Sequence, residues 1–156
     1  AMRDYEKKDV MTKEISTMLC AKEYEVAEAV GRLKSEQTRM KSQIAELQQK
    51  LLKFCVAEIP VDEKIVTVFD GSLSGNLPRE MMNQLLDKGA VICAVFAGTD
   101  EEGYRYVIGS RSEDVRSISK TLNSTLEGRG GGKPEMVQGS VKGTEDAVKE
   151  IIARYQ

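Results

Sequence analysis

The residues with the clearest chemical potential lie together between Gly128 and Ser140, in the stretch GRGGGKPEMVQGS. Two basic side chains, Arg129 and Lys133, flank its central glycines. Backbone N–H groups of glycine can approach a phosphate closely because no side chain stands in the way, and nearby cations favour the same anion. The stretch therefore predicts either a phosphate-binding surface or, more simply, a helix end followed by a flexible turn.

The common nucleotide-binding templates do not fit this stretch. A P-loop ending at Gly132–Lys133 requires glycine at position 127 and serine or threonine at position 134, where the chain has Glu127 and Pro134. A GxGxxG fingerprint that starts at Gly128 requires glycine where Lys133 stands. Both templates also lead from a strand into a helix, whereas here the glycines follow a predicted helix and precede an extended segment. The alternatives that remain are contact with a sugar-phosphate backbone and a left-handed helix cap at Gly128.

The composition removes most catalytic chemistry. The chain of 156 residues contains no histidine and three cysteines, which are widely spaced. A Ser-His-Asp triad, an HExxH metal site and a His/Cys zinc site are therefore excluded. Without a CxxC pair, the cysteines favour a reducing cytoplasm over a disulfide framework. We expect no catalytic residues, no metal ligands and no cofactor in this chain, and a cytoplasmic location.

Basic residues gather near the glycines although the net charge of the chain is −2. From Val115 to Lys133, four basic side chains stand against the single acid Glu127. Arg116, Lys120 and Asn123 are expected to share one helix face, away from the apolar residues. Such a basic corner suits the sugar-phosphate backbone of a nucleic acid. Gln138 can hydrogen-bond a sugar or base edge of the same nucleic acid, and a hydrogen bond inside the domain is an equal alternative for it. The predicted nucleic-acid contacts are Arg116, Lys120, Arg129, Gly130, Gly131, Gly132, Lys133 and Gln138.

Two helices are expected to precede these elements, because residues 2–54 contain no proline and a single glycine. A short helix is expected at about 4–19, followed by a break near 20–22 and a long helix. Apolar residues of the long helix alternate spacings of four and three, which is a heptad pattern. This pattern predicts either self-association or packing on the chain's own globular domain, and spacing alone does not separate the two. The seam residues are Leu33, Gln37, Met40, Ile44, Leu47 and Leu51.

Beyond Pro60 the pattern changes to that of a compact α/β domain. Strands are expected at 64–69, 90–96, 104–108 and 136–141, the middle two forming a hairpin. One helix should begin at Pro78 and end at Gly89, and two others should be capped by Ser112 and Thr144. The predicted fold class is α/β (α+β), with a long N-terminal helical hairpin or coiled coil before a small domain of about four strands and three helices. We expect a helical dimerisation element at 1–56 and an α/β domain at 57–156, with a glycine-rich loop at 128–139.

Residues 130–139, GGGKPEMVQG, resemble the glycine motif of the DHH-associated domain at the C-terminus of alanyl-tRNA synthetases and related alanyl-tRNA editing proteins. The motif matches throughout if Val137 stands for its small residue. The first residues, from AMRDYEKKDV to about GRLK, resemble the segment that follows the editing domain in those proteins. The likeness thus covers nearly the whole chain in the expected order.

This resemblance implies a C-terminal portion of a longer protein, either a synthetase or a free-standing editing protein. It implies contact with tRNA, in particular tRNA(Ala), a homodimer, no membrane association and no catalysis by this chain alone. Zinc would belong only to an upstream editing domain. Two other interpretations stay open: a substrate-binding accessory domain of a DHH-type phosphoesterase, and a purely structural coiled-coil unit. The relevant phosphoesterases carry histidine after the glycines, where this chain has Lys133.

Overall fold

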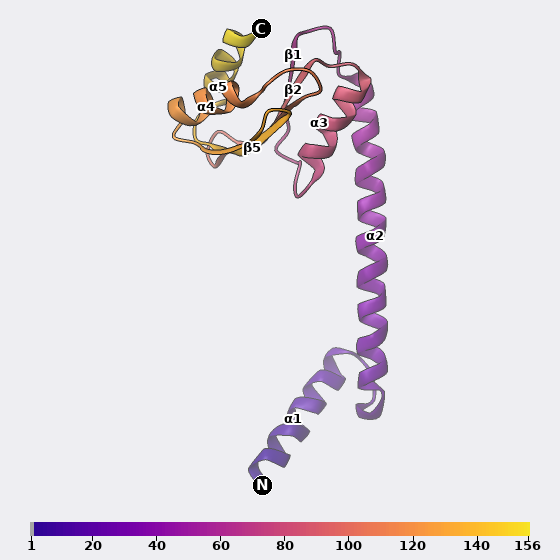
Figure 1. Ribbon diagram of the computed structural model, residues 1–156. Helices are drawn as coiled ribbons and strands as arrows, with labels where there is room; N and C mark the ends of the chain where they lie inside the picture. The colour runs from indigo at the N-terminus through magenta and orange to yellow at the C-terminus, as the bar shows by residue number, and fades with distance from the viewer. Residues whose placement is uncertain (1) are drawn as a thin grey trace. The chain divides into compact units, whose positions relative to one another are not determined.

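The computed structural model describes residues 2–156 (Figure 1). The chain divides into two compact units, one ending at Lys50 and one beginning at Leu51. A long helix precedes a small mixed sheet with its own helices, which confirms the predicted fold class.

The N-terminal unit is helical throughout its regular structure. Helix α1 spans Met2–Met18, a 3₁₀ turn covers Glu23–Glu25, and the 33-residue helix α2 spans Val26–Glu58, continuing into the second unit. The break between the helices contains Cys20, whose φ of 48° lies in the left-handed region. Nothing within residues 2–50 covers the apolar stripe of α2. The side chains of this stripe are 49–63% exposed at Val30, Leu33, Met40, Ile44 and Leu47.

The C-terminal unit is built on a five-stranded sheet in the order β1-β2-β3-β5-β4. Strands β1 and β2 are parallel, and the remaining neighbours are antiparallel. The predicted hairpin between the second and third strands is confirmed. The strands are β1 (Ile65–Phe69), β2 (Ile92–Thr99), β3 (Gly103–Ser110), β4 (Arg129–Lys133) and β5 (Met136–Val141).

Helices cover both faces of this sheet but not equally (Figure 1). Helix α3 (Leu77–Lys88) packs on β2 and β3, around Met81, Leu85 and Val95, and the last turns of α2 add Leu52 and Val56 to the same core. On the other face, α4 (Arg116–Thr125) and α5 (Glu145–Ile152) enclose a core that includes Tyr106 and Leu122. Because α3 does not reach across to β4, the first face is left open over the glycine strand.

The helix boundaries test the expected caps. Pro78 lies in the first turn of α3, Gly89 ends that helix, and the Thr144 side chain accepts a hydrogen bond from the Ala147 backbone, as predicted. The Ser112 cap was wrong. Helix α4 begins at Arg116, and Ser112 lies in the turn before it. The backbone N–H of Ser112 donates to the Ser110 hydroxyl at 3.2 Å.

The predicted glycine loop at 128–139 was also wrong, because β4 and β5 form a hairpin there with a turn at 134–135. This adds a fifth strand to the expected four. Gly128 is not the left-handed cap either: that conformation falls on Glu127, whose φ is 47°. Glycine has low strand propensity, so the local pattern did not predict β4. Its ladder with β5 and its position beneath α4 hold it extended.

Candidate nucleic-acid interface

The register of the hairpin determines which way each site residue faces. Arg129 lies opposite Ser140, Gly131 opposite Gln138, and Lys133 opposite Met136. Val137 is fully buried on the α4 side, and side chains alternate along a strand, so Gln138 faces the open side. Opposed residues of an antiparallel pair share a face, which places Arg129, Gly131 and Lys133 on the same open side.

The three central glycines of β4 are not equivalent. A Cβ at Gly130 would lie 2.5 Å from the Gly139 Cα and 2.7 Å from the Tyr106 hydroxyl. A Cβ at Gly132 would lie 3.0 Å from the Val137 Cα and would meet the Met136 carbonyl oxygen. At Gly131, by contrast, a Cβ would have nothing within 4 Å. Packing explains glycine at 130 and 132, whereas at 131 the space is free for a ligand.

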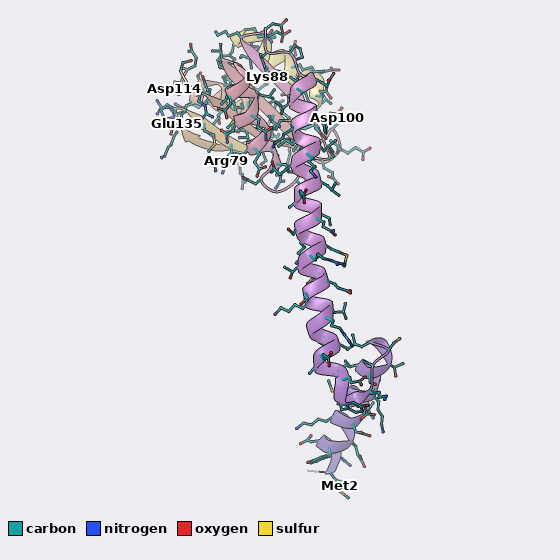
Figure 2. The ribbon with its side chains drawn as sticks, turned by 90° about the vertical axis from the view of Figure 1, so that its right-hand side faces the viewer. Met2, Arg79, Lys88, Asp100, Asp114 and Glu135 are labelled. Atoms are coloured by element: carbon teal, nitrogen blue, oxygen red, sulfur yellow. The ribbon has the colours of Figure 1, made fainter. Side chains whose placement is uncertain are left out.

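Two shallow hollows lie next to each other on the open face, the first of them beside Gly131. The first, of about 440 Å³, is lined by residues that include Arg79, Arg111, Gly131, Lys133 and Gln138. The second, of about 330 Å³, adjoins it at Gln138 and is lined by residues that include Pro78 and Arg105. Figure 2 shows Arg79 and Glu135, which both line the first hollow, on the same side of the C-terminal unit, away from Asp100.

The open face carries charges of both signs, with Glu135 lining the first hollow and Glu127 lying near Arg129, but most of its cations have no carboxylate partner within the described chain. Arg79, Arg105, Arg129 and Lys133 are exposed, and none of them forms an ion pair within residues 2–156. Arg111 differs because it pairs with Asp87 at 3.0 Å. Four such cations around an unobstructed backbone form a surface that attracts a polyanion.

The nucleic-acid contacts predicted from the sequence did not include Arg79 and Arg105. Arg105 had a usable signal, because it stands between Tyr104 and Tyr106 in a strand and must face away from their core. Arg79 had none, since only the packing of α3 on the sheet brings it to the glycines.

Arg116 and Lys120 lie elsewhere. Both project from the outer side of α4, which covers the opposite face of the sheet. The Arg116 guanidinium pairs with the Asp114 carboxylate at 2.6 Å, and these hydrogen bonds lower the pKa of Asp114 to about 2. The expectation that Asn123 shares their exposed face was wrong: its side chain turns inward to Tyr106 and Gly130. The predicted residues therefore fall into two groups on opposite faces.

The profile of the DHHA1 domain family matches residues 62–156, which include the whole sheet and its three helices. The chain belongs to the DHHA1 domain family. The alanine–tRNA ligase of Psychrobacter sp. (strain PRwf-1) is 25% identical over 157 aligned positions, covering 93% of this chain and 17% of that protein. The enzyme of the same name from Streptococcus mutans serotype c is 27% identical, covering 98% of this chain and 18% of its own length.

These relatives confirm the resemblance to alanyl-tRNA synthetases, and this DHHA1 chain spans less than a fifth of their length. Among solved structures, RecJ in complex with Mg²⁺ from Thermus thermophilus superposes with a TM-score of 0.58 at 16% identity. That match covers 90% of this chain and 21% of RecJ, and it establishes a shared fold.

Residues 2–156 contain neither a metal-binding cluster nor a helix that could span a membrane. In this part of the DHHA1 chain, His, Cys, Asp and Glu side chains form no group of three or more that could hold a metal ion. No helix described between residues 2 and 156 combines the length and apolar character needed to cross a bilayer.

Proposed function

We propose that this DHHA1 chain is a tRNA-binding and dimerising portion of an alanyl-tRNA synthetase or alanyl-tRNA editing protein, acting in the cytoplasm on tRNA(Ala). The observation that carries the proposal is the open glycine face. Gly131 has nothing within 4 Å of its Cβ position, and around it stand four cations that form no ion pair within the described chain. Such a surface favours a sugar-phosphate backbone over a folded protein partner, because phosphates need close approach and positive charge but little side-chain fit.

In this proposal, the tRNA backbone runs across β4, β5 and β3 on the open face. Arg129 and Lys133, at the two ends of β4, contact phosphates on either side of Gly131. Arg79 and Arg105 extend the same surface onto α3 and β3. The Gln138 side chain is exposed opposite Gly131 and can hydrogen-bond a ribose or a base edge.

Gly130 and Gly132 take part in this interface only through their backbone, because the Cβ direction at both positions is filled by packing within the domain. Arg116 and Lys120 take part only if the tRNA curves around the β4 edge of the sheet. Arg116 has less attraction for phosphate to offer, since Asp114 already neutralises it.

Dimerisation is assigned to the stripe of α2. Its residues Leu33, Gln37, Met40, Ile44, Leu47 and Leu51 repeat at heptad spacing, and the apolar members are 51–63% exposed. A second copy of the same stripe would bury these side chains, and the polar Gln37 would set the register. The chain alone is proposed to catalyse nothing, and any zinc would belong to an upstream editing domain.

A second candidate function rests on the hollow at Gly131. Its volume of about 440 Å³ and its lining by Arg79, Lys133 and Gln138 suit a mononucleotide, which a phosphoesterase accessory domain would hold. The hollow is shallow and continues into the second one at Gln138, which favours a longer strand.

The test is tRNA binding to the whole chain, measured by fluorescence anisotropy from low to moderate salt. We expect log Kd to rise linearly with log salt, and Arg129→Ala/Lys133→Ala to reduce that slope by about 0.7–0.9 per lost phosphate contact. Adenosine monophosphate serves as competitor. No binding of tRNA by the wild-type chain, or displacement by micromolar nucleotide, would contradict the tRNA proposal, and displacement would support the second candidate.

A further inference from the structure

A line of buried and partly buried polar groups runs beneath the glycine strand, on the side away from the proposed ligand. The Tyr106 side chain is only 1% exposed, and its hydroxyl lies 2.7 Å from the Ser119 hydroxyl and donates to Asn123 Oδ1 at 3.0 Å. Because that hydroxyl has one hydrogen, Ser119 must be the donor in the other bond. Asn123 Nδ2 then donates to the Gly130 carbonyl oxygen at 3.2 Å.

These groups meet the glycine hairpin at several points. The Cβ positions of both Gly130 and Gly139 lie 2.7 Å from the Tyr106 hydroxyl, so this oxygen sits directly beneath the paired strands. The backbone carbonyl of Asn123 also accepts from the Gly128 N–H at 2.9 Å, which fixes the entry to β4. One tyrosine from β3 and two residues of α4 thus hold a strand that has no central side chains of its own.

Strand β4 is expected to be poorly ordered without these contacts. Strand β4 lies at the edge of the sheet, paired on one side only, and glycine loses more conformational freedom on ordering than any other residue. A backbone ligand site that has to be ordered on binding loses affinity, whereas a pre-ordered one does not.

We infer that Tyr106, Ser119 and Asn123 are positioning residues that hold β4 in its ligand-binding conformation from the opposite face of the sheet. None of the three lines the hollow at Gly131. Tyr106 borders the second hollow, but its side chain is only 1% exposed and its hydroxyl bonds to α4, so the three residues act through the strand and not by side-chain contact with the ligand. The inference rests on the proposed function for its effect on tRNA, but the ordering of β4 can be measured without any ligand.

The experiment compares Tyr106→Phe and Asn123→Asp with the wild-type chain. The first removes the central hydroxyl. The second keeps the acceptor for Tyr106 but replaces the donor to Gly130 by an oxygen. Tyr104→Phe is the matched control, because Tyr104 lies in the same strand and on the same face, and its hydroxyl donates to Asp100 at 2.7 Å, away from β4.

Amide exchange of residues 128–133 and tRNA affinity are measured for each variant. We expect exchange at these amides to accelerate by about three- to tenfold in Tyr106→Phe and Asn123→Asp and not in Tyr104→Phe. The Kd for tRNA should rise by a similar factor while its salt slope stays at the wild-type value, since no phosphate-binding cation is lost.

Each alternative outcome has a definite meaning. Unchanged exchange at β4, or acceleration spread evenly over the sheet, would overturn the positioning role. Faster exchange at β4 with unchanged tRNA affinity would overturn the link to binding. If the wild-type chain binds no tRNA, the proposed function fails, and the exchange data still decide whether the three positioning residues order β4.

Discussion

At the scale of single residues, alanine substitutions at two glycines of β4 should have opposite effects on stability and on tRNA affinity. Gly131→Ala adds a methyl group into empty space, so stability should change by less than about 1 kcal/mol, while tRNA affinity falls because the methyl group blocks close approach. Gly130→Ala places the same group 2.5 Å from the Gly139 Cα and should cost several times more stability, about 2–4 kcal/mol. Urea unfolding and anisotropy on the same samples measure both effects.

The two variants control for each other, since they differ only in the face that receives the methyl group. Full tRNA affinity in a well-folded Gly131→Ala chain would contradict the assignment of this glycine to the ligand. Equal destabilisation by both changes would contradict the packing derived for Gly130.

At the scale of elements, sequence periodicity was sufficient to predict the helices and strands in which apolar side chains alternate or repeat. The strand that holds Val95 and Phe96, the cap at Thr144 and the end of α3 at Gly89 all follow local rules, and each was predicted. Strand β4 could not be predicted in this way, because glycines carry no alternation. Its direction depends on pairing with β5, a non-local interaction.

The candidate site was predicted in part for the same reason. Arg129, Lys133 and Gln138 adjoin the glycines in the sequence and share the open face in the hairpin. Arg79 and Arg105 reach that face from α3 and β3, so only the folded sheet joins them to it. Arg116 and Lys120 are close in the sequence, but α4 turns them to the other side.

The junction between α2 and the sheet gives a prediction at this scale. Lys88 Nζ donates to the carbonyl oxygens of Val56, Ala57 and Ile59 at 2.9, 2.7 and 2.7 Å, at and just beyond the last turn of α2. Lys88→Met keeps the length of the side chain but leaves these acceptors without their cation. We expect a loss of about 1–3 kcal/mol in unfolding free energy, measured by urea denaturation. Lys53→Met, an exposed change on α2 itself, should cost less than about 0.5 kcal/mol, and equal losses would contradict this role for Lys88.

At the scale of the whole molecule, the exposed stripe of α2 predicts a dimer. Ile44→Lys/Leu47→Lys places two charges in the proposed seam, where burial without partners costs several kcal/mol, so the double variant should sediment as a monomer. Ser35→Lys/Ser42→Lys adds the same charges at heptad positions opposite the seam and should remain dimeric. A wild-type chain that is monomeric at high micromolar concentration in sedimentation equilibrium would contradict the dimer.

The central claim is that tRNA binds the open glycine face and not the α4 face. The most direct measurement is the salt dependence of tRNA binding for two matched double variants, Arg105→Ala/Lys133→Ala on the open face and Arg116→Ala/Lys120→Ala on α4. We predict that the first reduces the slope of log Kd against log salt by about 1.4–1.8, and that the second changes it by less than half as much, because Arg116 is already paired with Asp114. The reverse order, with the α4 variant losing the larger slope, would contradict the account.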